Sequence, residues 1–225
     1  PVNLDRSTEP ALTKREWRDV GVITLMLLMM VVLGLGYDQI FNMGMVWVDQ
    51  TVNLDSSMGR FPVAWFTSVD AGATVAASVG VIILWRWQAA RGQEASDSTK
   101  IAIGGILTGA GVAILAIGSA VAEGGRVSIF FPVAAFLFTG TGFTWYWPAW
   151  LAMVSRHAPP KIAARMMAAA YLVGFIGSVT SGFVATFYET MTPTLFWTLN
   201  AGVCFLGSAA FYVFGPMLTR VLVSE

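Results

Sequence analysis

The stretch that decides the fold is FFPVAAFLFTGTGFTWYWPAWLAMVSRHAPPKIAARMM, residues 130–167. It contains an apolar segment, a short basic hairpin and the beginning of a second apolar segment. No charged residue occurs between Val127 and Val154, which is long enough for a helix to cross about 30 Å of hydrocarbon. The stretch therefore predicts two membrane-spanning helices joined by a tight connection.

Pro148 interrupts the first of these segments and is flanked by Trp145, Tyr146, Trp147 and Trp150. A proline removes a backbone hydrogen bond and bends a helix, which a membrane helix tolerates where neighbours or water cover the free carbonyl. Trp145 and Trp147 should lie well below the headgroup level at which aromatic residues usually gather. We interpret the segment as a cavity wall with a gating kink at Trp145 and Pro148. The alternative is a tightly packed helix with a structural kink.

The composition indicates a helical membrane protein with several spans, because 56% of the 225 residues are hydrophobic and 12% are charged. It excludes an ordinary soluble domain. The single cysteine, Cys204, excludes an intrachain disulfide and a thiolate metal site. The sequence contains no HExxH, GxSxG, phosphate-loop or dinucleotide motif. We therefore expect no enzyme, no metal and no organic cofactor, a lipid bilayer as partner, and no nucleic acid.

Six apolar segments predict an all-α bundle of six transmembrane helices in one domain, over residues 20–47, 63–85, 101–121, 127–154, 163–188 and 194–217. Of the 13 lysines and arginines, only Arg60 and Arg126 lie on one side of this bundle. The others lie on the opposite side and are Arg6, Lys14, Arg15, Arg18, Arg86, Arg91, Lys100, Arg156, Lys161, Arg165 and Arg220. Positively charged loops stay in the cytoplasm. We therefore expect both termini to be cytoplasmic, in a plasma membrane or a bacterial inner membrane.

Two acids, Asp38 and Asp70, fall inside the predicted spans, where a charge is costly and is usually retained for function. Both should lie at similar depths on consecutive antiparallel helices, so they could share one aqueous cavity. A carboxylate in such a cavity is a natural proton carrier. Asn42 lies one turn beyond Asp38 on the same face, and Gln39 adds a neighbouring donor. The alternative is that the acids lie in interfacial water or cap an interrupted helix.

Neither acid has a basic partner within these spans, since each lysine and arginine falls in a loop or at a helix end. A counter-ion for Asp38 would have to come from another polypeptide segment. His157 is the only histidine and falls in the basic hairpin. We interpret it as a solvated loop residue rather than a proton relay.

Several short segments resemble the proton-dependent oligopeptide transporters of the major facilitator superfamily. One runs from Pro148 to Pro159 as PAWLAMVSRHAP and is followed by RMM at 165–167 and by Gly177-Ser178. Another is Tyr37-Asp38-Gln39, which is similar to the Phe-Glu-Gln of that family's seventh helix, and a third runs from Phe61-Pro62 to Asp70. The resemblance covers nearly the whole chain.

The resemblance implies the fold of the C-terminal half of a twelve-helix carrier, with the N-terminal half absent from this chain. Superfamily carriers place their substrate between two six-helix halves. The resemblance also implies that protons are the coupling ion, with Asp38 at the proton-coupling position. The missing half, on the same or a separate chain, would supply the cations that Asp38 lacks, from an acidic-acidic-arginine motif and a lysine.

Three departures from the family pattern alter the expected pocket. Phe143 follows Gly142 where the family usually has a glutamate, Trp147 replaces a small serine, and Asp70 replaces an asparagine. These changes put ordinary di- and tripeptides in doubt as substrates. They lead to the hypothesis that Asp70 anchors a cationic group of the substrate or shares a proton with Asp38. The residues expected to contact substrate are Gln39, Asn42, Asp70, Phe143 and Trp147.

The leading hypothesis is half of a proton-coupled symporter that moves peptides or peptide-like solutes by alternating access. A carrier of the same superfamily for a different organic solute is one alternative. A stand-alone six-helix protein that assembles or scaffolds partners without transport is another. A parent chain about twice this length would favour a carrier.

Overall fold

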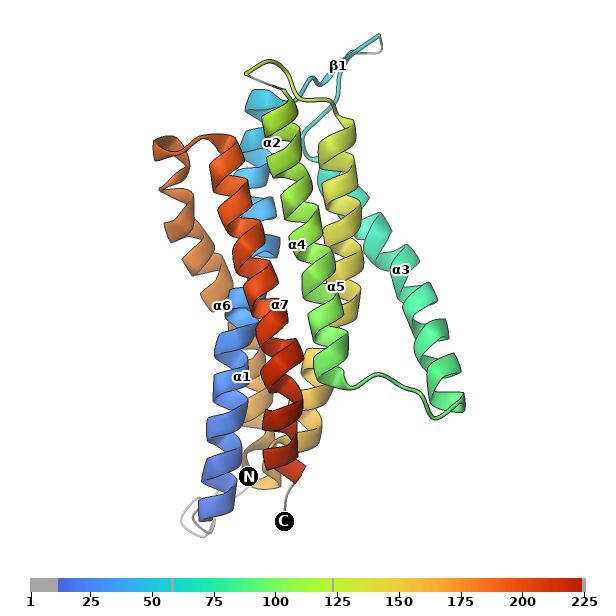
Figure 1. Ribbon diagram of the computed structural model, residues 1–225, viewed down its shortest axis with the longest axis vertical. Helices are drawn as coiled ribbons and strands as arrows, with labels where there is room; N and C mark the ends of the chain where they lie inside the picture. The colour runs from blue at the N-terminus through green and yellow to red at the C-terminus, as the bar shows by residue number, and fades with distance from the viewer. Residues whose placement is uncertain (1–11, 58, 123, 224–225) are drawn as a thin grey trace, which may run out of the picture.

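The computed structural model describes residues 12–57, 59–122 and 124–223, so Arg6 of the charge pattern lies outside the described residues. Figure 1 shows long helices that run up and down an elongated bundle, with the start of α1 and the end of α7 at the same end of the bundle. The long helices are α1 (Lys14–Gln39), which continues through a π-helical turn (Ile40–Gly44) into α2 (Met45–Thr51), then α3 (Trp65–Ala90), α4 (Asp97–Val121), α5 (Phe130–His157), α6 (Ala163–Ala185) and α7 (Pro193–Val223).

Short elements connect these helices. Two-residue strands β1 (Asp55–Ser56) and β2 (Gly59–Arg60) pair antiparallel between α2 and α3, and single 3-10 turns occur at Pro160–Ile162 and Tyr188–Thr190. The loop after α2 is tied to the loop before α5, since the Val127 amide donates to the Thr51 carbonyl across 2.8 Å. The all-α class and the six-helix arrangement predicted from the sequence are therefore confirmed, with α1 and α2 forming one continuous rod.

Local sequence explains where α1 begins. The Thr13 hydroxyl accepts a hydrogen bond from the Glu16 amide at 3.2 Å, and the Glu16 carboxylate accepts one from the Thr13 amide at 2.7 Å. This reciprocal capping box satisfies two backbone donors that would otherwise lack partners at a helix N-terminus. The same carboxylate also lies 3.1 Å from Lys161 Nζ, which ties the start of α1 to the connection between α5 and α6.

Five described segments are long and apolar enough to cross a membrane, by length and composition: Lys14–Thr51, Trp65–Ala90, Asp97–Val121, Pro160–Thr190 and Pro193–Val223. Helix α5, which is uncharged from Phe130 to Val154, is not among them. Its Trp, Tyr, Thr, Gly and Pro residues lower its mean hydropathy. Helix α5 packs against α3 and α4, so its less apolar residues contact neighbouring helices.

Small residues bring α4 and α5 close together. A Cβ built on Gly104 would lie 2.7 Å from the Gly142 carbonyl oxygen, and a Cβ built on Gly142 would lie 2.6 Å from the Gly104 carbonyl oxygen. Hydrogen is therefore the only side chain that fits at either position without a shift of backbone. Close approach of this kind is how membrane helices associate when lipid supplies no hydrophobic drive. This close approach makes α4 the central helix. In its apolar 18-residue stretch 61% of the residues are buried, compared with 17% for α3 and 22% for the segment that contains α6.

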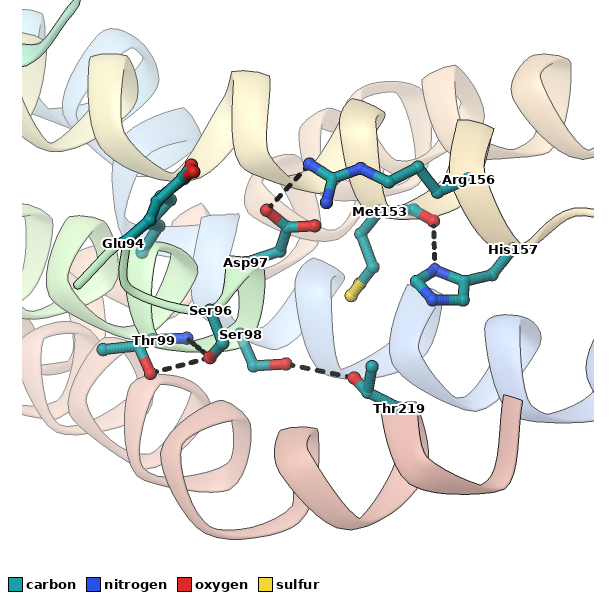
Figure 2. Close-up of polar contacts among 10 residues, drawn as sticks. Glu94, Ser96, Asp97, Ser98, Thr99, Met153, Arg156, His157 and Thr219 are labelled. Atoms are coloured by element: carbon teal, nitrogen blue, oxygen red, sulfur yellow. Dashed lines mark hydrogen bonds and ion pairs between the residues drawn. The ribbon is translucent and has the colours of Figure 1, made fainter. Parts of the chain in front are cut away.

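Polar contacts join the helix ends near the termini, as Figure 2 shows. Arg156 in the last turn of α5 lies 3.2 Å from Asp97 in the first turn of α4. The Nζ atom of Lys100 lies 2.5 Å from a carboxylate oxygen of Glu94 and 4.3 Å from the centre of the Trp85 ring. His157 Nδ1 bonds to the carbonyl of Met153 one turn earlier at 2.8 Å, which is a contact within its own helix.

Candidate transport site

Helices α1, α5 and α6 line a pocket of about 230 Å³. Its polar lining consists of Asp38, Tyr37 and Tyr146, and its aromatic lining includes Phe143 and Trp147. The remaining lining residues are small or aliphatic: Met30, Val31, Gly34, Val173 and Gly174. Among the described residues, no lysine or arginine lines this pocket. The pocket therefore offers aromatic surface and one carboxylate.

The aromatic side chains of the pocket form a continuous row. Phe143 stacks on Tyr37 with ring centres 5.0 Å apart and on Trp147 with ring centres 5.8 Å apart. Trp147 in turn meets the edge of Tyr171 on α6 at 5.9 Å. Phe143 and Trp147 are four residues apart on α5, so both project from the same face of that helix. A row of this kind can stack on flat groups and, through its ring faces, attract cations.

Asp38 is half-buried at the α1–α6 contact. Its Oδ1 atom accepts a hydrogen bond from the Ser178 hydroxyl at 3.4 Å. No lysine or arginine in the described part of the chain forms an ion pair with it. A carboxylate at this depth therefore has a hydroxyl as its polar partner and no counter-charge within the described chain.

Asp70 is covered, with 5% of the residue exposed. The Tyr37 hydroxyl donates to its Oδ2 atom at 3.2 Å, and the Thr139 hydroxyl donates to its Oδ1 atom at 3.4 Å. Gly140 makes room for it, because a Cβ there would lie 2.5 Å from the Asp70 carbonyl oxygen. Asp70 does not line the pocket that contains Asp38. The two acids are linked indirectly, through Tyr37.

Gln39 and Asn42 also face α6 and do not line the pocket. The Ser181 hydroxyl donates to Gln39 Oε1 at 2.5 Å and accepts from Asn42 Nδ2 at 3.4 Å. Gln39 is fully buried, and its Nε2 atom has no hydrogen-bond partner among the described residues. With Asp38 and Ser178, these side chains form a polar strip along the α1–α6 interface.

Comparison with protein families identifies the family of this chain. Residues 4–200 match a family model described as POT family. The chain belongs to the POT family. Its members are membrane transporters of the peptide-transporting branch of the major facilitator superfamily, and not enzymes, so the resemblance drawn from the sequence motifs is confirmed.

Solved POT structures share the fold at low sequence identity. A peptide transporter POT mutant in complex with sulfate superposes with a TM-score of 0.85 at 18% identity, covering 95% of this chain and 43% of that one. A POT family transporter in complex with 5-aminolevulinic acid gives 0.84 at 15% identity, with 94% and 44% covered. The POT family transporter PepTSo gives 0.77 at 14% identity, with 96% and 45% covered. The chain thus spans less than half the length of these transporters. A search of curated proteins found no match.

The remaining residues predicted from the sequence of this POT family chain lie apart from the pocket. Trp145 meets the edge of Trp85 on α3 with ring centres 5.8 Å apart, so it faces the α3–α5 contact. Pro148 lies inside α5, which continues from Phe130 to His157, and is exposed. A gating role for either residue stays a prediction.

Sequence reasoning missed Tyr37, Tyr146 and Ser178 as site residues. It gave most weight to charge inside spans, and these side chains carry none. For Tyr37 the signal was present, because it is adjacent to Asp38 and lies one turn before Phe41. Those two rings are 4.9 Å apart. No comparable signal marks Ser178, whose partner lies 140 residues away in the chain.

Proposed function

We propose that this chain is the C-terminal half of a proton-coupled symporter that works by alternating access, with Asp38 as the proton-coupling residue. A second half, on the same or another polypeptide, would complete the substrate cavity. The observation that carries the proposal is Asp38 itself: a half-buried acid, on the wall of the pocket, without a cation among the described residues. Such an acid can exchange a proton with the cavity.

The outer faces of α3 and α6 support a missing half. Most residues in the apolar stretches of α3 and α6 are not buried within the bundle. Apolar side chains on these faces include Val75, Val79 and Ile83 on α3 and Phe175, Val179 and Phe183 on α6. A second six-helix half would cover these faces, and it would bring a cation to Asp38.

The pocket chemistry supports a solute with an amine or other cationic group beside a flat or apolar group. Asp38 would attract the cation, and the Tyr37–Phe143–Trp147 row would stack on the apolar part. Solved POT relatives are described in complex with alafosfalin and with a thioalcohol-conjugated peptide. These names support peptide-like solutes. Gln39 and Asp70 are buried, so they would reach such a solute only after α1, α3 or α6 moves, whereas Asn42 is exposed but lies outside this pocket.

The positions of the charged residues support cytoplasmic termini. The end of the bundle that holds the termini also holds the ion pairs of Lys161, Arg156 and Lys100. At the other end, Arg60 pairs with Asp49 at 2.8 Å and Arg126 donates to the Val52 carbonyl at 3.2 Å. The excess of basic residues marks the cytoplasmic side.

Uptake into vesicles tests the proposal. This chain would be reconstituted with its N-terminal half, and uptake of radiolabelled alanyl-alanine, alanyl-phenylalanine and 5-aminolevulinic acid would be measured with and without an inward proton gradient. We expect gradient-driven uptake of at least one probe, its loss in Asp38→Asn, and survival of exchange in that variant, since exchange needs no net proton movement.

Undiminished uphill uptake by Asp38→Asn would remove Asp38 from the mechanism. Uptake of other organic solutes but of none of these probes would favour a different substrate class. A protein that moves no solute, yet forms stable six-helix assemblies, would favour the scaffold alternative.

A further inference from the structure

The Asp38 carboxylate rests directly on α6. A Cβ built on Gly177 would lie 2.2 Å from Asp38 Oδ2 and 3.3 Å from the carboxyl carbon. The neighbouring Ser178 hydroxyl donates to Asp38 Oδ1 at 3.4 Å. We call this surface, made of Gly177 and Ser178, the α6 seat. One of its residues gives the carboxylate room and the other gives it a hydrogen bond.

The close approach is specific to this glycine. Gly174 lies about one turn earlier on α6 and Gly182 lies five residues later, and a Cβ on either would meet no atom within 4 Å. A side chain would therefore fit at 174 or 182 but would displace the acid at 177. The fit of α6 to the carboxylate is thus a local property of Gly177.

The α6 seat can hold the Asp38 side chain in both its charged and its protonated form. A hydroxyl can donate to a carboxylate and can accept from a carboxylic acid, so Ser178 can remain bonded to Asp38 in both states. The seat provides no opposite charge within the described residues. A buried charge without a partner is costly. A cation brought by another half would therefore compete with the seat for the charged carboxylate.

We infer that the α6 seat is a positioning element for Asp38: Gly177 and Ser178 hold its carboxylate against α6, and the carboxylate leaves the seat when it pairs with a cation of the other half. Proton exchange at Asp38 then acts directly on the contact between α1 and α6. This inference rests on the proposed role of Asp38, and it adds which helix senses the proton.

The polar strip gives the seat a neighbour that can serve as a control. Ser181 lies one turn beyond Ser178 on the same helix, but its hydroxyl bonds to Gln39 and not to Asp38. Ser178→Ala and Ser181→Ala therefore each remove one hydroxyl from the same interface, and only the first touches the acid. Gly177→Ala and Gly182→Ala form a second matched pair on α6.

The first test needs no substrate. The carbonyl stretch of protonated Asp38 would be followed by infrared difference spectroscopy over pH in the reconstituted protein, with Asp38→Asn identifying the band. Because a hydrogen bond to a charged carboxylate is stronger than one to the neutral acid, Ser178→Ala is expected to change the proton affinity of Asp38 by up to about tenfold. Ser181→Ala should leave the titration unchanged. Equal titrations in the two serine variants would overturn the inference.

The second test is a double-mutant cycle on stability. Gly177→Ala should lower the melting temperature in the normal background, and Gly182→Ala should not. In an Asp38→Ala background the penalty of Gly177→Ala should largely disappear, because the group that it displaces is absent. An equal penalty in both backgrounds would mean that Gly177 is needed for packing alone, and the inference would fail.

Uptake separates this inference from the proposed function. Suppose that Ser178→Ala changes the titration of Asp38 but Asp38→Asn leaves gradient-driven uptake intact. The proposed function then fails, while the seat stands as a local contact. If Asp38→Asn abolishes coupling but Ser178→Ala changes neither the titration nor the pH dependence of uptake, Asp38 acts without the seat.

Discussion

The phenolic oxygen of Tyr37 lies 3.2 Å from Asp70 Oδ2 and donates a hydrogen bond to it. The residue that precedes Asp38 in the chain therefore connects α1 to the acid of α3. The same Tyr37 ring stacks on Phe143 of α5. One side chain on the pocket wall thus joins α1, α3 and α5.

Removing this hydroxyl should loosen α3. Tyr37→Phe keeps the ring stack but leaves Asp70 with the Thr139 hydroxyl as its remaining side-chain donor. Loss of a bond to a buried charged group costs about 1–3 kcal/mol, so the melting temperature in detergent should fall. Tyr171→Phe is the control, since Tyr171 is exposed at 57%. Equal melting temperatures for the two variants would contradict the link.

Asp70→Asn should weaken solute binding less than the sequence suggested, where Asp70 was expected to anchor a cationic group of the substrate. Had Asp70 contacted a cationic group, the loss would be about ten- to a hundredfold in affinity. Asp70 is instead covered by Tyr37 and Thr139. We expect alanyl-lysine binding to change by less than about threefold in Asp70→Asn and by more than about tenfold in Asp38→Asn.

A larger loss in Asp70→Asn would mean that Asp70 becomes accessible in another conformation. In that case Phe143→Glu, combined with Asp70→Asn, should restore binding, since it returns an acid to the pocket wall. Failure of the double variant would separate the two positions.

Topology can be checked with an impermeant thiol reagent. Cys204 is buried, so the natural protein should give little background labelling. Cysteines placed at the exposed positions 53, 55 and 57 should react from outside, whereas those at 92–96 should react only after permeabilisation. The reverse pattern would overturn the orientation inferred from the basic residues.

Protonation of Glu94 should contribute to the loss of stability at acid pH. The hydrogen bond from Lys100 and its charge hold the pKa of Glu94 below its usual value of 4.5. A lowered folded-state pKa contributes stability that is present above the ordinary pKa and is lost as pH falls through the lowered value. The melting-temperature difference between the natural protein and Glu94→Gln should therefore shrink below about pH 4.5. A difference that is constant from pH 7 to pH 3 would contradict this assignment, and Glu189→Gln provides a control.

Periodic and compositional features of the sequence predicted the six-helix fold and placed Asp38 on a pocket wall. They did not predict contacts between side chains that lie far apart in the chain. Asp70 matched the depth of Asp38, yet whether it opens to a cavity was decided by Tyr37, 33 residues away, and by Thr139, 69 residues away. Absence of charge alone also does not make α5 one of the five segments that are long and apolar enough to span a membrane, because Trp, Tyr and Thr lower hydropathy without adding charge.

Helical spacing placed Asn42 on the same face as Asp38. Four residues separate them, and both side chains bond to α6, Asp38 to Ser178 and Asn42 to Ser181. Asn42 is nevertheless absent from the lining of the pocket that contains Asp38. It lies within the π-helical turn Ile40–Gly44, where each hydrogen bond spans five residues rather than four.

That turn also affects how this chain should be aligned with its relatives. A π-helical turn holds one residue more than an α-helical turn, so side chains beyond Gly44 are rotated by about 100° relative to an uninterrupted α-helix. At sequence identities of 14–18%, too few residues are identical to reveal such an offset in an alignment. An alignment of α1 with a relative that lacks the turn therefore needs a one-residue gap at Ile40–Gly44. Without it, equivalences assigned at Trp47 and Asp49 would refer to the wrong face of the helix.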